Sequence, residues 1–227
     1  MKKEILKTDG RSCSVYSMEK PSALLIQPMG QQEVAGMDSE VELIARKCGR
    51  QFAMAAFDIV DWLAELTPWP DPVVSKSPEV GKQADATLAY IEKQLLPCLR
   101  RRFGNLPCIL GGYSLGALFA LWAAYKSDIF SGVAASSPSV WIKDWLHFTA
   151  QHQMKARHVY LSLGDREEFT RNKAIAQVGS NIREYHQTLV AQLGEENTTL
   201  KWNAGSHFKN AAVRTADGFA WNMKSLC

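Results

Sequence analysis

The chain carries the motif G-x-S-x-G at 112–116, between two apolar runs. The apolar run before it, 107–110, has the length of a buried strand, and the run after it, 115–125, is apolar on nearly every side, as in a buried helix. A serine on such a strand-to-helix turn stands clear of the end of the sheet, where it can act as a nucleophile. The turn is crowded, so the positions two before and two after the serine must be very small. Gly112 and Gly116 meet that demand.

The rest of the chain alternates short apolar runs with longer segments of helical period, which is typical of βαβ units and a mostly parallel sheet. We predict strands at 12–18, 23–26, 52–57, 107–110, 132–136, 158–163 and 198–202. We predict helices at 38–48, 82–96, 115–125, 143–152, 174–193 and 210–224. The 227 residues suit one α/β domain over 1–227, with helices on both faces of the sheet.

One long segment, about 58–81, has no clear period and is rich in proline. Such loops are often binding elements, and we place this one near the site. Together with Trp141, its Trp62 and Trp69 are candidates for lining an apolar substrate pocket. Packing into the core is the alternative for all three tryptophans.

Ser114 needs a base, because a serine hydroxyl is a weak nucleophile until a neighbour takes its proton. In a fold of this kind the chain order is serine, acid, histidine. Of the five histidines, His207 alone follows the last predicted strand. It lies on the loop at that strand's C-terminal end, where the active sites of open α/β sheets are found. We therefore predict that His207 is the base.

The acid should follow the predicted strand at 158–163, where the chain reads Gly164-Asp165-Arg166-Glu167-Glu168. From sequence alone all three carboxylates could reach the base. We favour Glu167, because hydrolases commonly place the acid three residues after such a glycine. Asp165 and Glu168 stay open as alternatives.

Four segments resemble the Putative esterase family of α/β hydrolases, the group that contains esterase D and the enterochelin esterases. The likeness covers roughly residues 20 to 224 and is carried by 111–122, 133–141, 160–164 with the carboxylates after it, and 205–208. The resemblance implies an α/β-hydrolase fold without a metal or organic cofactor. It also implies that Ser114, Glu167 and His207 take the triad positions.

Two backbone N–H groups are candidates for holding the oxyanion of an acyl-transfer reaction. The first belongs to Leu115, because the N–H groups at the start of a helix are free and lie at its positive end. Many α/β hydrolases carry His-Gly near the second donor, whereas this chain has Gln27-Pro28-Met29-Gly30. Pro28 has no N–H, so we expect Met29 to donate, with Gly30 behind it.

Charge and cysteine content argue against several other classes of protein. The net charge is only +3, without the large basic face that a nucleic-acid binder needs. Five widely spaced cysteines fit neither a disulfide framework nor a zinc site. The first residues lack a signal peptide, and no stretch approaches the roughly 18 apolar residues of a membrane helix. We expect a cytoplasmic protein that acts on a small-molecule ester, while its oligomeric state stays unknown.

The residues together predict ester hydrolysis through an acyl-enzyme. Acyl transfer and thioester hydrolysis use the same machinery and remain alternatives. A peptidase is disfavoured, since nothing in the chain resembles an additional domain that selects peptide substrates. A different class, a non-catalytic binding protein that keeps a hydrolase fold, also remains open.

Overall fold

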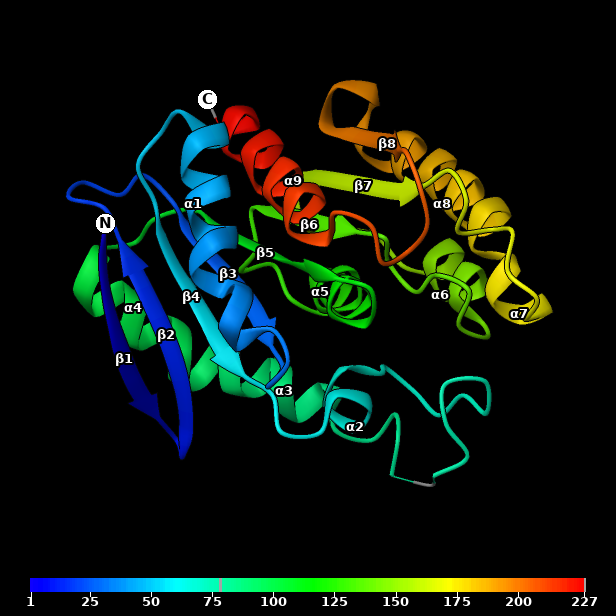
Figure 1. The fold of residues 1–227 in the computed structure, drawn as a ribbon, viewed down its shortest axis with the longest axis horizontal. Coiled ribbons are helices and arrows are strands. Elements are labelled where there is room, and N and C mark those ends of the chain that lie inside the picture. Colours follow the sequence, from blue (N-terminus) through cyan, green and yellow to red (C-terminus); the bar gives the residue numbers. More distant parts are fainter. Residues whose placement is uncertain (78, 227) are drawn as a thin grey trace.

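The centre of the molecule is an eight-stranded sheet with the order β1-β2-β4-β3-β5-β6-β7-β8 (Figure 1). β1 pairs antiparallel with β2 and β2 with β4, and all the other pairs are parallel. The strands are Lys2–Thr8, Arg11–Ser17, Leu24–Met29, Ala53–Asp58, Cys108–Tyr113, Gly132–Ser136, His158–Gly164 and Thr198–Asn203, numbered β1 to β8 in that order. This mostly parallel sheet confirms the predicted fold class. The computed structural model describes residues 1–77 and 79–226, so Pro78 of the proline-rich loop and Cys227 lie outside the described residues.

Helices cover both faces of the sheet. One face carries α1 (Met37–Cys48) and α9 (Ala211–Ser225), which lie side by side in Figure 1. The helices associated with the opposite face are α3 (Ala84–Tyr90), α4 (Leu96–Phe103), α5 (Leu115–Lys126), α6 (Trp145–Gln151) and α8 (Val178–Leu193). Alternate residues of β3 show the two faces, because Leu24 and Ile26 join the core under α5 while Leu25 packs with α1 and α9.

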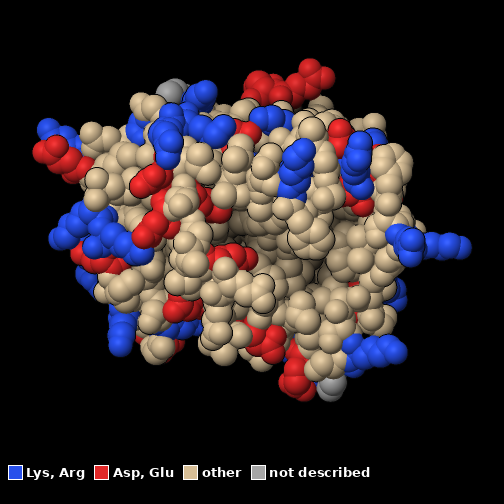
Figure 2. Space-filling view, viewed as in Figure 1, with Lys and Arg blue, Asp and Glu red and all other residues tan. Residues whose placement is uncertain are grey.

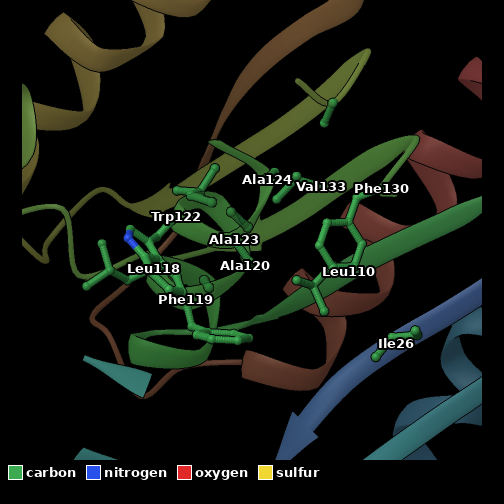
Figure 3. Close-up of a cluster of buried hydrophobic side chains, with 14 of the residues drawn as sticks. Ile26, Leu110, Leu118, Phe119, Ala120, Trp122, Ala123, Ala124, Phe130 and Val133 are labelled. Atoms are coloured by element: carbon green, nitrogen blue, oxygen red, sulfur yellow. The ribbon is translucent and has the colours of Figure 1, made fainter. Parts of the chain in front are cut away.

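α5 lies at the middle of the larger core. Every residue from Leu115 to Tyr125 is buried, as the all-round apolar pattern predicts. Figure 3 shows Leu118, Phe119 and Trp122 of this helix in one buried cluster with Ile26, Leu110 and Val133 of the neighbouring strands. The N-terminal end of α5 carries the predicted nucleophile, so this packing fixes the position of the turn that precedes it.

Two helical segments differ from the sequence prediction. The expected helix 174–193 is divided at Gln177 into α7 (Lys173–Ala176) and α8. The expected helix 82–96 continues to Phe103 and is π-wound over Ile91–Leu95. Pro97 explains the change of winding, because its ring clashes with the preceding turn and it cannot donate a hydrogen bond to the carbonyl four residues earlier.

The N-terminal strand β1 and the short helix α2 (Trp62–Leu66) were not predicted. β1 is an edge strand whose side chains are exposed or half-buried, so its sequence lacks a buried run. α2 begins at Asp61, whose carboxylate accepts hydrogen bonds from the N–H groups of Leu63 and Ala64. Among the described residues, no helix is long and apolar enough to span a bilayer. The cytoplasmic location stays a prediction.

Candidate active site

Ser114 forms the sharp turn between β5 and α5. Its backbone has φ 56° and ψ −116°, an unfavourable combination for a residue other than glycine. Two hydrogen bonds hold the turn: Ser114 N–H donates to the Ser136 carbonyl at 3.0 Å, and Leu118 N–H donates to the Ser114 carbonyl at 3.0 Å. The surrounding backbone therefore maintains a strained conformation that presents the hydroxyl beyond the end of β5.

The small residues of the motif are required by close backbone contacts. A Cβ atom added to Gly112 would lie 2.8 Å from the carbonyl carbon of Gly116, and one added to Gly116 would lie 3.2 Å from the ring of Pro28. The first separation is shorter than real Cβ atoms adopt, and the atom it meets belongs to the backbone. The turn cannot accept a side chain at Gly112 without moving α5.

We therefore expect Gly112→Ala to lower the free energy of unfolding by about 1–3 kcal/mol, the usual cost of overpacking. Urea denaturation of both proteins measures the change. Gly36→Ala is a matched control, because no atom lies within 4 Å of the position of its Cβ and its φ of −90° suits alanine. Equal stability of the two variants would contradict the close packing described for the turn.

His207 lies on the loop between β8 and α9, within reach of Ser114. Its Nε2 is 3.0 Å from Ser114 Oγ, and its Nδ1 is 2.7 Å from Glu167 Oε2. An ionised carboxylate can only accept, so Nδ1 carries the proton and Nε2 is free to accept from the serine hydroxyl. The loop itself is held by Tyr113, whose hydroxyl donates to the His207 carbonyl at 2.6 Å. The geometry is that of a nucleophile, a base and an orienting acid in series.

The three candidate carboxylates lie in different places. Glu167 contacts His207, whereas Asp165 accepts from the backbone N–H of Gly205 at 2.7 Å. Glu168 pairs instead with Arg183 on α8, at 2.8 and 3.0 Å. Glu167 is the one of the three that the structure brings to the histidine.

Donors surround the buried carboxylate of Glu167, which is 8% exposed. Its Oε1 accepts from Gly164 N–H at 2.7 Å, from the Ser137 hydroxyl at 2.8 Å and from Arg214 at 2.8 Å. Burial by itself raises the pKa of this carboxyl. The hydrogen bond and charge of His207, with the bonds from Gly164 and Ser137, outweigh burial and leave the pKa below the ordinary glutamate value. Glu167 is therefore ionised across the neutral pH range.

Sequence reasoning missed three of the polar residues around this group. Ser137 and Ser139 follow β6, and Ser139 Oγ lies 3.5 Å from Ser114 Oγ. Arg214 is on α9 and is 1% exposed. A serine-rich stretch after a strand is a weak signal for the first two. An arginine in an amphipathic helix gives no signal, because that pattern normally places it on the surface.

A cavity of about 400 Å³ opens at the candidate triad. Figure 2 shows a hollow near the middle of one face of the molecule, bordered mainly by uncharged residues. Apart from Ser114, Glu167 and His207, the cavity is lined chiefly by apolar side chains and Arg166; the apolar ones are Pro138, Trp141, Phe169, Ile175, Val178 and Phe208. The site can therefore take a largely apolar group beside Ser114.

Only one of the three predicted pocket tryptophans lines this cavity, and that is Trp141. Trp62 packs against the nucleophile turn, within 3.5 Å of where a Cβ of Gly116 would lie. Trp69 donates its indole N–H to the Lys143 carbonyl at 2.8 Å and stacks on Trp145. Trp69 thereby holds the proline-rich loop against α6, as in the alternative in which a tryptophan packs into the core and does not line the substrate pocket.

The two candidate oxyanion donors differ in their surroundings. Leu115 begins α5, so its N–H has no partner within the helix. The Met29 carbonyl accepts from Ile59 N–H at 2.9 Å and so faces β4. Since the N–H and C=O of one residue in an extended strand point the same way, the Met29 N–H also faces β4. The next N–H, that of Gly30, donates to the carboxylate of Glu33.

No set of three or more His, Cys, Asp or Glu side chains within 1–77 and 79–226 is arranged to hold a metal ion.

Comparison with family models gives a match to the family described as Putative esterase over residues 53–216, well over half of the chain. The matched region contains β4 to β8 and all three residues of the candidate triad. No curated protein sequence matches the chain.

Solved structures share the fold at low sequence identity. Siderophore hydrolase EstA from Aspergillus nidulans has a TM-score of 0.72 and 19% identity, covering 98% of this chain and 93% of its own. EstB from the same organism has a TM-score of 0.72 and 17% identity, covering 96% and 93%. The enterobactin esterase FES from Shigella flexneri has a TM-score of 0.69 and 18% identity, with all of this chain aligned to 60% of FES. At these identities the likeness concerns the fold.

Proposed function

The chain belongs to the Putative esterase family and is a carboxylic ester hydrolase, and we propose that Ser114, His207 and Glu167 carry out the reaction through an acyl-enzyme. The observation that carries the proposal is the series of two short contacts, 3.0 Å from Ser114 Oγ to His207 Nε2 and 2.7 Å from His207 Nδ1 to Glu167 Oε2. The predicted order of serine, acid and histidine along the chain agrees with it.

In the first step, Ser114 Oγ attacks the ester carbonyl carbon as His207 Nε2 takes its proton. The resulting oxyanion is held by the N–H of Leu115 and by one from the turn after β3. The carbonyl of Met29 faces β4, so the N–H of Gly30, which belongs to the same peptide, points away from β4. We therefore assign the second donor to Gly30, whose N–H becomes free once the Glu33 carboxylate moves away. Each such donor contributes about 100- to 1000-fold to the rate.

The oxyanion then collapses, the bond to the alcohol oxygen breaks, and the His207 imidazolium gives its proton to that oxygen. Water attacks the acyl-enzyme in the same way, with His207 again taking a proton. When the acid leaves, the proton returns to Ser114 Oγ. Glu167 stays ionised throughout and stabilises the imidazolium that forms in each half of the reaction.

A fluorophosphonate probe tests this function directly, because it bonds covalently to an activated serine. We expect wild type to be labelled at Ser114, as read by mass spectrometry of the labelled peptide. Absence of labelling would favour the binding-protein alternative. Product analysis with competing alcohols or thioesters separates hydrolysis from the acyl-transfer and thioesterase alternatives.

The charge of the cavity indicates what kind of ester fits it. Arg166 lines the cavity and makes no ion pair within the described part of the chain. Glu167, the other charged lining residue apart from the histidine, is already paired with His207 and Arg214. An apolar cavity with one unneutralised cation suits an ester that carries a negative charge on its acyl part. Siderophores and enterobactin belong in a substrate panel, because EstA and EstB are named siderophore hydrolases and FES is named an enterobactin esterase.

We expect Arg166→Gln to raise KM for 4-nitrophenyl hydrogen adipate by about tenfold, because losing one charged hydrogen bond weakens binding by about this factor. KM for 4-nitrophenyl hexanoate, which has a methyl group in place of the carboxylate, should not change. Steady-state kinetics on the two esters measures the difference. Arg171→Gln is the matched control, since this exposed arginine lies outside the cavity lining. Equal effects on both esters would rule out an anion subsite at Arg166.

A further inference from the structure

Arg214 is a charged side chain almost completely removed from solvent. It comes from the first turn of α9 and is 1% exposed, on a helix whose other buried residues are mostly apolar. A buried guanidinium is costly unless acceptors surround it. The identity of those acceptors therefore indicates why the arginine is there.

All of the oxygens bonded to Arg214 belong to the candidate active site. Nη1 lies 2.8 Å from Glu167 Oε1, 3.0 Å from Ser137 Oγ and 3.1 Å from Tyr113 Oη. Nη2 lies 3.1 Å from the Ser206 carbonyl. One guanidinium thus contacts the triad acid, the residue before the nucleophile and the residue before the base.

These contacts come from four separate parts of the fold. Tyr113 ends β5, Ser137 follows β6, Glu167 follows β7, and Ser206 lies on the loop after β8. The site leaves little freedom to move, because a Cβ on Gly164 would lie 2.9 Å from both Arg214 Nη2 and Glu167 Oε1. The guanidinium is therefore closely packed as well as hydrogen-bonded through Nη1 and Nη2.

Glu167 is held by cationic or potentially cationic groups on both oxygens. Arg214 is at Oε1 and His207 is at Oε2. The hydroxyls of Tyr113 and Ser137 and the N–H of Gly164 also face this pair. Arg166 lines the cavity beside Glu167 and His207, whereas the neighbouring Asp165 and Glu168 are bonded elsewhere. Arg214 thus offsets part of the carboxylate charge that would otherwise act on the imidazole alone.

We propose that Arg214 is a positioning residue that fixes Glu167 and limits how strongly this carboxylate stabilises the protonated form of His207. The role in catalysis rests on the proposed function, since it requires His207 to act as a base. Without the cation, the full carboxylate charge would favour the imidazolium, and the base would be protonated up to a higher pH.

The experiment follows the His207 imidazole by NMR titration in the full-length protein, with His207→Gln used to assign its signal. We expect the midpoint to move upward by about one pH unit in Arg214→Met. In Arg214→Lys, which keeps the charge, it should stay near the wild-type value. Arg183→Met removes the arginine that pairs with Glu168 and should also leave the midpoint in place. An unmoved midpoint in Arg214→Met, or an equal shift in Arg214→Lys, overturns the proposal.

Turnover gives a second readout. The acidic limb of kcat/KM should move upward with the NMR midpoint in Arg214→Met, which a merely structural role would not produce. The titration needs no turnover, so an inactive wild type whose midpoint still responds to Arg214→Met would overturn the proposed function and leave the effect on the imidazole supported.

If Arg214→Met does not fold, the double variant Glu167→Gln/Arg214→Met removes both buried charges together and tests the same point. Because Arg214 acts through the charge of Glu167, the double variant should have a kcat/KM no lower than that of Glu167→Gln. A further tenfold loss would show that Arg214 acts through something else and would overturn the inference.

Discussion

Ser114→Ala is expected to lower kcat for ester hydrolysis by about a million-fold, the usual consequence of removing a triad nucleophile. The covalent route is lost with Oγ, while the cavity, His207 and Glu167 remain in place. KM should change little, because the lining of the cavity is preserved. Steady-state kinetics with a 4-nitrophenyl ester, together with fluorophosphonate labelling, measures both effects.

Ser139→Ala provides the matched control for this variant. Its hydroxyl lies 3.5 Å from Ser114 Oγ, so it occupies the same cavity without contacting His207 through any described hydrogen bond. It should retain labelling and most of its activity. If Ser114→Ala were labelled as well as wild type, or Ser139→Ala lost labelling instead, Ser114 would not be the nucleophile.

Glu167→Gln is expected to lower kcat by about ten-thousand-fold, as in other triads whose acid becomes an amide. The donors around Oε1 decide the orientation of the new side chain. Gly164 N–H, Ser137 and Arg214 all require an acceptor there, so the amide oxygen takes this position. The amide NH2 then faces His207 Nδ1, which becomes an acceptor, and Nε2 carries the proton and cannot accept another from Ser114.

The two neighbouring carboxylates supply controls for the Glu167 prediction. Asp165→Asn loses a bond to the Gly205 backbone, and Glu168→Gln weakens a pair with Arg183 at the surface. Both should keep kcat near the wild-type value. A ten-thousand-fold loss in either one, with Glu167→Gln still active, would transfer the role of acid to that residue.

Glu167→Gln also provides a test of stability, because the change in the free energy of unfolding with pH has an expected sign. The pKa of Glu167 in the folded protein lies below its ordinary value of 4.5, so the native state holds the anion more tightly than the unfolded chain does. The resulting stabilisation is present above pH 4.5 and is lost as the pH falls through the folded-state pKa. Urea denaturation across this range should show wild type losing more stability than Glu167→Gln. An equal loss in both proteins would contradict the lowered pKa.

Local patterns carried most of the information about the fold. Apolar runs predicted the six strands from β3 to β8. The helix after Ser114 was predicted from its all-round apolar composition, which matches its complete burial. The edge strand β1 escaped prediction, because one side is open to solvent and its sequence lacks a buried run. The division at Gln177 escaped as well, since one apolar period continues through both helices.

The acid shows the limit of local reasoning at the site. Asp165, Glu167 and Glu168 lie within four residues, and each has a carboxylate that could reach a loop histidine. The conformation of the turn after β7 directs Asp165 to Gly205, Glu168 to Arg183, and Glu167 to His207. The tryptophans differ for a similar reason, because the path of the proline-rich loop takes Trp69 to α6 and away from the cavity.

The fold class and the candidate nucleophile and base followed from the amino-acid sequence, because they depend on a crowded turn, on strand and helix periods, and on the order of residues along the chain. The motifs of the chain also resemble those of the family. Three outcomes required the three-dimensional arrangement: which carboxylate meets the histidine, which tryptophan lines the cavity, and the burial of Arg214 beside Glu167. Those outcomes depend on where loops from β5, β6, β7 and β8 converge with α9. Convergence of segments distant in sequence is set by the packing of the whole sheet and leaves no local pattern in the chain.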